Sequence, residues 1–184
     1  MAGIILEGKV IAESIRASIR GEVEVLKKNF RKIPRLVAVQ IGDNASSAVY
    51  VKSQRRLAEE LGIAYEIKNI AGDASQDEIE RSLTQLSNDK EVNAVMLQLP
   101  LPKGIDHKRL LEKVAPNKDA EGMNPYNLGK LVSGHFEVGP CTALAVMELI
   151  RSTNTDLYGK EAVVVGHSEI VGKPLAMLLL AKFA

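Results

Sequence analysis

The chain has 184 residues, of which 46% are hydrophobic and 26% are charged, a balance typical of a globular domain with a sizeable core. Its formal net charge of +1 gives no electrostatic reason to expect binding to nucleic acid or to an anionic membrane. Cys141 is the only cysteine, which excludes an intrachain disulfide and favours a reducing cytoplasm. Glu7 interrupts the first apolar residues too early for a signal peptide, and no apolar run approaches the roughly 18 residues of a membrane span.

The first element predicted is a helix over residues 9–28, because five apolar residues recur on one helical face. These are Ile11, Ile15, Ile19, Val23 and Leu26. Pro34 then marks a break. The apolar run 36–41 predicts a buried strand that ends at Gly42.

A second helix is expected over residues 46–61, with Gly62 as its C-cap, followed by an alternating strand over 65–70. Ser75 and Glu78 have the spacing of a capping box, which predicts a helix that runs to about residue 88.

Residues 92–99 predict a third apolar strand, and Asp106 is expected to cap a short helix that ends near residue 114. Three strand–helix alternations at this spacing imply right-handed βαβ units. The sequence therefore predicts an α/β fold with a parallel sheet.

The pattern changes over residues 115–140, which are rich in Pro, Gly and Asn and have no sustained period. Thr142 is then expected to cap a helix that ends at Ser152, and a second sheet is expected to start at Ala162.

The last part of the chain, residues 162–174, has an apolar run, a turn between Gly166 and Gly172, and the start of a helix. This is how a Rossmann-like dinucleotide-binding domain opens. We therefore expect two parts, 1–139 as a first α/β domain and 140–184 as a linker helix with the first βα unit of a nucleotide-binding domain.

Ligands of open parallel sheets bind at the carboxyl ends of the strands, which draws attention to Gly42 and to residues 98–102. Tyr50 lies about one turn into the helix after Gly42, and Gln54 follows four residues later on the same helical face. Two prolines directly after the third strand suit the wall of a cleft. Taken singly, Tyr50 also fits an aromatic that covers a helix face, and Gln98 an ordinary polar strand end.

The remaining reactive side chains give no site of their own. Cys141, between a proline and a threonine, is expected to be a small buried thiol rather than a nucleophile. His107, His135 and His167 do not have metal-ligand spacing, so no metal is predicted.

Six segments, read together, resemble the bifunctional methylenetetrahydrofolate dehydrogenase/methenyltetrahydrofolate cyclohydrolase family, in order and at the family's spacing. They are Tyr50 with Val51, and residues 95–102, 118–122, 125–131, 140–142 and 166–174. Each motif is weak alone, whereas six in order are highly specific.

The resemblance implies a folate domain, a Rossmann domain and a folate cleft between them. It implies that Tyr50 stacks on the aminobenzoyl ring, that Leu99 and Pro100 also contact the folate, and that Gln98 assists the residue at position 54. In the family that residue is the catalytic lysine. An aspartate at the position of Glu121 hydrogen-bonds the pterin.

The resemblance also implies NADP or NAD as the cofactor, held at the nucleotide turn. The residues expected there are Gly166, His167, Ser168, Ile170 and Gly172. It implies a cytoplasmic homodimer whose ligands are tetrahydrofolate derivatives and NAD(P). From the net charge and the histidine spacing, no nucleic acid, membrane or metal partner is expected.

Three departures from the family occur at these positions. Gln54 replaces the catalytic lysine with an amide that has neither charge nor acid–base function near neutral pH. Lys52 and Arg55 are expected to point away from Gln54 and not to replace the lysine. Glu121 keeps the pterin-binding carboxylate on a chain one methylene longer, and His167 replaces the usual arginine.

Two functions follow. The first is the dehydrogenase and cyclohydrolase activity of the family. The alternative is a degenerate or truncated folate-binding or interaction protein without turnover, favoured by Gln54 and by the single βα unit of the second domain. The apolar face of the last helix is expected to lack a partner within the chain. Its residues are Leu175, Leu178, Leu179 and Phe183.

Overall fold

The computed structural model describes residues 5–43 and 45–183, with the side chains of all of these except 45–48, 182 and 183. Its residue contacts divide into two compact units. Ser18–Ala120 forms one unit, and the residues up to Ala17 together with those from Glu121 onward form the other. None of the helices described has the length and apolar character needed to cross a membrane.

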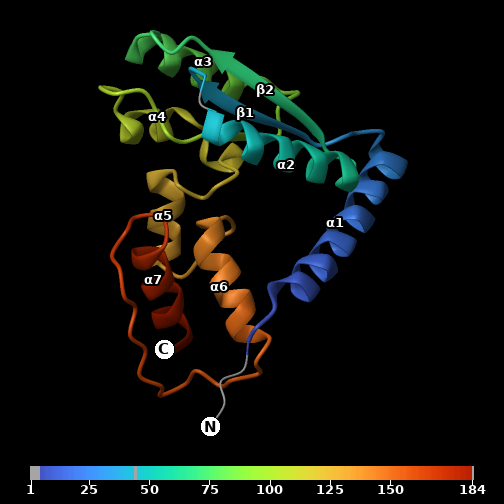
Figure 1. Cartoon of the computed structure of the whole chain (residues 1–184). Helices are drawn as coiled ribbons and strands as arrows, with labels where there is room; N and C mark the ends of the chain where they lie inside the picture. The colour runs from blue at the N-terminus through green and yellow to red at the C-terminus, as the bar shows by residue number, and fades with distance from the viewer. Residues whose placement is uncertain (1–4, 44, 184) are drawn as a thin grey trace. The chain divides into compact units, whose positions relative to one another are not determined.

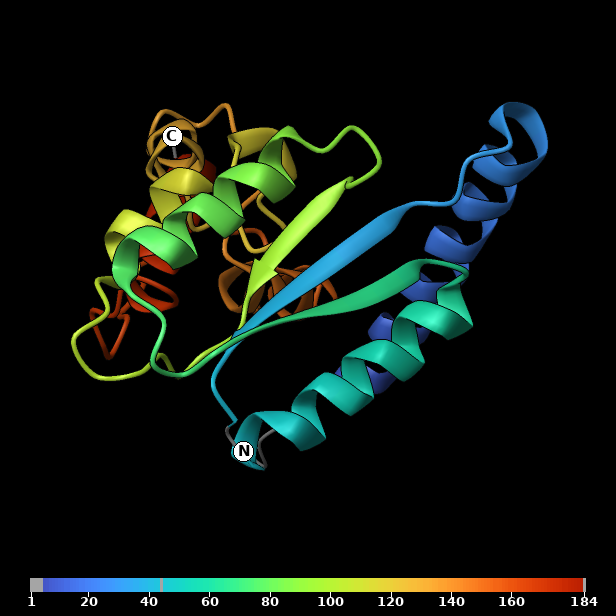
Figure 2. The same ribbon diagram turned by 90° about the horizontal axis from the view of Figure 1, so that it is seen from above.

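The unit Ser18–Ala120 is built on a three-stranded parallel sheet (Figure 1, Figure 2). Its strands are β1 (Arg35–Ile41), β2 (Ala64–Ile70) and β3 (Ala94–Leu97). They are arranged in the order β2-β1-β3, so β1 is central and pairs with both neighbours. The prediction of an α/β fold with a parallel sheet is confirmed, although β3 is shorter than expected.

Helices α2 (Ala45–Leu61), α3 (Gln76–Asn88) and α4 (His107–Lys113) belong to the same unit. The predicted capping box is present: the Ser75 hydroxyl accepts from the Glu78 amide, and the Glu78 carboxylate accepts from the Ser75 amide at 2.8 Å. Asp106 caps α4 as expected, accepting from the amides of the first turn. Local sequence therefore sets where both helices begin.

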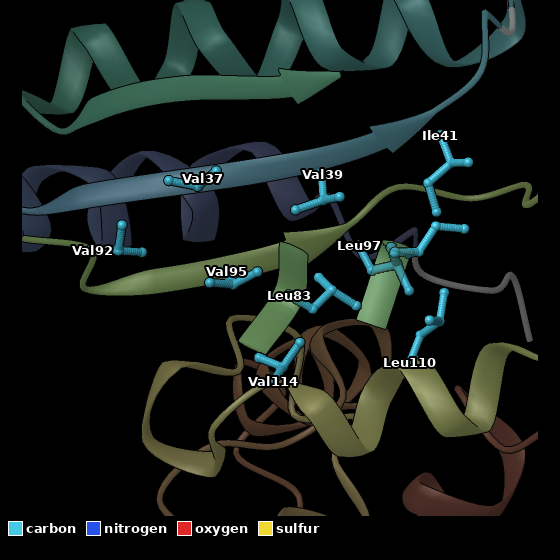
Figure 3. Close-up of a cluster of buried hydrophobic side chains, with 10 residues drawn as sticks. Val37, Val39, Ile41, Leu83, Val92, Val95, Leu97, Leu110 and Val114 are labelled. Carbon is cyan, nitrogen blue, oxygen red and sulfur yellow. The ribbon is translucent and has the colours of Figure 1, made fainter. Parts of the chain in front are cut away.

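One face of the sheet is a dry apolar layer, covered by α3 and α4 (Figure 3). Alternate residues of β1 and β3 point into it, because successive side chains of a strand alternate between faces. The fully buried members of this cluster are Val37, Val39, Val92, Val95, Ile79, Leu83 and Leu110. α2 lies on the opposite side of the sheet from α3 (Figure 1, Figure 2).

α1 (Gly8–Phe30) starts in one unit and ends in the other. Within the Ser18–Ala120 unit, Val23 is buried, and its side chain lies close to Gly62, directly after α2. A Cβ at Gly62 would come within 3.2 Å of Val23, so the expected glycine at this C-cap also permits close packing.

The other unit contains α5 (Pro125–Val132), α6 (Cys141–Arg151) and α7 (Gly172–Phe183). These helices share a second apolar cluster, to which α7 contributes Leu178 and Leu179, 5% and 7% exposed. The expectation that the apolar face of the last helix lacks a partner within the chain is therefore wrong for these two residues. Leu175 is half-buried and packs against the same cluster, and the side chain of Phe183 lies outside those described.

Residues 115–140 are more ordered than their composition indicates. They contain the short 3₁₀ helix η1 (Pro116–Lys118) as well as α5, which begins at Pro125 because the Asn124 side chain accepts from the Tyr126 amide at 2.8 Å.

Three further predictions in this unit need correction. α6 begins at Cys141, two residues earlier than expected, with Pro140 rather than Thr142 in the cap position. Cys141 is exposed, not buried, since it lies in the first turn of that helix. Residues 162–166 form no strand, because no neighbouring strand pairs with them among the described residues.

Candidate functional site

Three side chains from the strands meet on the face of the sheet that α2 covers. Tyr65 of β2 pairs with Leu36 of β1, and Met96 of β3 pairs with Ala38, which lies on the same face as Leu36. Gln98 follows Met96 by two residues, and its amide donates to β1 at 2.9 Å, which continues the ladder past the end of β3. Tyr65, Met96 and Gln98 therefore point to the side opposite the dry core.

The carboxamide of Gln54, on α2, joins these three side chains. Its oxygen accepts from the Tyr65 hydroxyl and from the Gln98 side-chain nitrogen, each at 2.9 Å. Its nitrogen donates to the Met96 sulfur at 3.3 Å, and the Gln98 nitrogen donates to the same sulfur at 3.1 Å. The structure thus brings the predicted residues Gln54 and Gln98 into direct contact.

These four side chains are all neutral in their ordinary protonation states. Burial raises the pKa of the Tyr65 phenol, and the positive charge of Arg55 only partly opposes this effect. The phenol is therefore protonated near neutral pH and can donate its hydrogen bond. Gln98 is 7% exposed, and its side-chain nitrogen donates to both Gln54 and Met96.

The nearest basic side chains on α2 do not join this cluster. Lys52 and Arg55 are exposed and line a shallow hollow with Arg56 and Glu59. Gln54 does not line that hollow. Neither cation hydrogen-bonds a member of this cluster, although the charge of Arg55 acts on the Tyr65 phenol.

The other predicted folate contacts of this unit lie on its surface. Tyr50 is 66% exposed one turn before Gln54, and Leu99 is 48% exposed directly after Gln98. Pro100 is exposed as well. Their exposed apolar surface lies near the carboxyl end of the sheet, where a flat ring system could pack.

Glu121, the predicted pterin contact, begins the other unit and is half-buried. The residue before it, Ala120, lies beside β3, since the Ala120 amide donates to the Val95 carbonyl at 3.1 Å.

The nucleotide turn is shaped by two glycines. Gly166 has φ +123°, and the space where its side chain would lie is open. A Cβ on Gly172 would come within 2.2 Å of the Gly166 carbonyl oxygen, so only glycine fits there. Ser168 closes the turn, because its hydroxyl accepts from the Val171 amide at 3.2 Å and from the Gly172 amide at 3.4 Å.

A hollow of about 600 Å³ opens beside this turn, lined by Gly166, Ser168 and Gly172 and by apolar residues that include Leu175. His167 is exposed, and Ile170 is 45% exposed. The open backbone position is at Gly166, in the turn that precedes the 12-residue helix α7, and the N-terminus of a helix commonly binds phosphate. Among the residues whose side chains are described, no cluster of His, Cys, Asp or Glu is arranged to hold a metal ion.

The sequence reasoning missed Tyr65 and Met96 as members of the Gln54 cluster. Strand alternation could have found Met96, because it lies two residues before Gln98 and so on the same face. Tyr65 could be assigned to that face only once the register between β1 and β2 was known.

The parallel βαβ sheet of one unit, and the glycine turn before a helix in the other, place the chain among α/β proteins with the features of nucleotide-binding domains. Residues 6–121 match the model of the tetrahydrofolate dehydrogenase/cyclohydrolase catalytic domain. Residues 140–184 match the NAD(P)-binding domain of the same family. The chain belongs to the tetrahydrofolate dehydrogenase/cyclohydrolase family.

Among its relatives, the bifunctional protein FolD of Magnetococcus marinus is 44% identical over 180 residues, which are 98% of this chain and 63% of the relative. The FolD structure from Campylobacter jejuni has a TM-score of 0.94 and 36% identity, covering all of this chain and 65% of that one. The FolD structure from Trypanosoma brucei, complexed with NADP cofactor and inhibitor, has a TM-score of 0.91 and 31% identity, over 100% and 63% of the two chains. The chain thus spans just under two thirds of the length of these relatives.

Proposed function

We propose that the chain carries the folate site of an NAD(P)-dependent 5,10-methylenetetrahydrofolate dehydrogenase and 5,10-methenyltetrahydrofolate cyclohydrolase of one-carbon metabolism. The observation that carries this proposal is the contact between Gln98 and residue 54, the two positions to which the family resemblance assigns catalysis. Tyr50, Leu99 and Pro100 would supply the apolar surface for the folate, and Glu121 would accept a hydrogen bond from the pterin.

The cofactor in this proposal is NADP or NAD, which would take up the hydride removed from the folate. Gly166 and Gly172 would let its pyrophosphate approach the backbone, with His167, Ser168 and Ile170 around it. The open space at Gly166 and the family match of residues 140–184 support this placement.

A second candidate is a protein that binds folate without hydrolysing its methenyl form, and the identity of Gln54 favours it. A neutral carboxamide cannot remove a proton from water or hold a positive charge beside the reacting carbon. On this view the fold and folate recognition persist while the cyclohydrolase step is lost.

We further propose that residues 1–139 form the folate domain and 140–184 the start of the NAD(P)-binding domain. The family matches at 6–121 and 140–184 support this division, while the residue contacts favour an earlier boundary at Glu121. A homodimer in the cytoplasm is proposed on the family resemblance, and the single cysteine is compatible with a reducing compartment.

Titration calorimetry with 5,10-methenyltetrahydrofolate, paired with the decay of its absorbance, tests both candidates. Binding with turnover supports the enzyme, and binding without turnover supports the second candidate. The absence of binding contradicts both.

A further inference from the structure

Tyr65 has no role in the family resemblance, yet its hydroxyl makes one of the two hydrogen bonds to the Gln54 oxygen. Tyr65 is on the edge strand β2, eleven residues after Gln54, and its side chain is half-buried. The Tyr65 side chain therefore extends from β2 to α2. Among the described residues, the one side-chain hydrogen bond that its hydroxyl makes is the bond to Gln54.

The hydrogen bonds of Gln54 determine which way its amide group faces. A carboxamide oxygen accepts about two hydrogen bonds, and both are made, by Tyr65 and Gln98. One of its two N–H groups donates to the Met96 sulfur, a weak acceptor. No acceptor for the second N–H occurs in the part of the chain that is described, so this group is available to a ligand.

We propose that Tyr65 is a positioning residue, which holds the Gln54 oxygen inward so that the free N–H of Gln54 points to a hydrogen-bond acceptor on the bound folate. This inference rests on the proposed function for the identity of the ligand. The orientation of Gln54 by Tyr65 does not depend on that function and can be tested without a ligand.

The directions of the hydrogen bonds in the cluster suit an amide at position 54. Tyr65 and Gln98 both donate toward Gln54, which suits a carbonyl oxygen. An ammonium group has no lone pair, so a lysine here would turn the Tyr65 hydroxyl from donor to acceptor. Tyr65 thus complements the departure at position 54.

The ligand-free experiment is a pH titration of tyrosine ionisation, measured by absorbance near 295 nm. The contribution of Tyr65 is the difference between the titration curves with and without the Tyr65→Phe substitution. Arg55 is the charged group that acts on Tyr65 in the folded chain, and it is unchanged in every variant. Gln54→Glu is expected to raise the pKa of Tyr65, because a carboxylate accepts from the neutral phenol and repels the phenolate. Gln54→Lys is expected to lower it, because an ammonium group stabilises the phenolate.

Tyr158→Phe is the matched control, because Tyr158 is 73% exposed and lies in the other unit. The pKa of Tyr158, obtained in the same way from the difference that Tyr158→Phe makes, should be identical in the Gln54→Glu and Gln54→Lys backgrounds. A Tyr65 pKa that does not change, or that changes in the opposite directions, overturns the proposal.

The ligand experiment is a double-mutant cycle, with the dissociation constant of 5,10-methenyltetrahydrofolate measured for the parent, Tyr65→Phe, Gln54→Ala and the double variant. Loss of one hydrogen bond should weaken binding roughly two- to tenfold for Tyr65→Phe in the parent. The same change should have no effect in the Gln54→Ala background, because Tyr65 acts through Gln54.

Equal weakening by Tyr65→Phe in both backgrounds would show a merely structural role and overturn the proposal. If the parent does not bind folate, the proposed function fails, and the titration of Tyr65 still decides whether Tyr65 and Gln54 are coupled.

Discussion

The backbones of Gly122 and Gly139 are in direct contact. The residues between them, which include α5, therefore form a loop whose two ends meet. A Cβ on Gly122 would come within 2.3 Å of the Gly139 carbonyl carbon, and Gly122 has φ +66°. Both residues belong to the same unit. The contact holds the first residues of this unit after Ala120 against the segment that leads into α6.

Gly122→Ala is expected to destabilise the protein by at least about 1–3 kcal/mol, since the left-handed backbone alone costs an alanine about this much and the overlap with Gly139 adds to it. Urea denaturation monitored by circular dichroism would measure the change. Gly129→Ala is the control, because Gly129 lies inside α5 with no atom within 4 Å of its Cβ position. It should be neutral or stabilising by up to about 1 kcal/mol. Equal stability of the two variants would contradict the role of the Gly122 contact.

The second candidate function predicts that the cyclohydrolase activity is absent or very weak, because loss of a general acid–base group typically lowers a rate about 10²- to 10⁴-fold. Gln54→Lys should restore measurable decay of methenyltetrahydrofolate absorbance. Ser53→Lys is the matched control, because it adds the same charge on the exposed side of α2, away from Gln98. Parental turnover as fast as that of an intact relative would show that Gln54 does not limit the reaction.

The residues around Gln54 illustrate what the sequence could predict. Only the family resemblance relates Gln54 to Gln98, and nothing in the sequence relates Tyr65 to either of them. Contacts between residues far apart in sequence depend on strand register and on which face a helix covers. The capping box of Ser75 and Glu78, by contrast, is made within one helical turn, so the spacing of the two residues was sufficient.

The same distinction accounts for the errors in the second unit. α5 is only eight residues long, and the proline and glycine in it masked its periodicity. The apolar run 162–166 has the composition of a strand, but a strand needs a hydrogen-bonded neighbour, and composition alone cannot supply one. The apolar face of α7 packs against α5 and α6, and α5 is a helix that the composition of residues 115–140 does not predict.

Tyr50→Ala is expected to weaken folate binding by several-fold, because aromatic stacking contributes about 0.5–1.5 kcal/mol beyond burial of area. Titration calorimetry with the folate would measure the change. Tyr158→Ala removes a comparably exposed tyrosine from the other unit and should leave the dissociation constant unaltered. Identical folate affinity of Tyr50→Ala and the parent would remove Tyr50 from the site.

The 184-residue polypeptide is expected to bind NAD(P) with a dissociation constant no better than about 1 mM, an interaction of roughly 4 kcal/mol. A Rossmann-like domain takes its adenosine contacts from the second strand and the loop that follows it. In the part of the chain that is described, the segment 162–166 has no strand neighbour, and Val163 and Val165 are 89% and 97% exposed. The glycine turn therefore acts with little support from the rest of a nucleotide site, and His167 contributes less positive charge than an arginine would.

Fluorescence or calorimetric titration with NADP measures the affinity. Gly172→Ala should remove the residual binding, because its Cβ would overlap the Gly166 carbonyl oxygen at 2.2 Å. Micromolar binding by the parent would contradict this expectation.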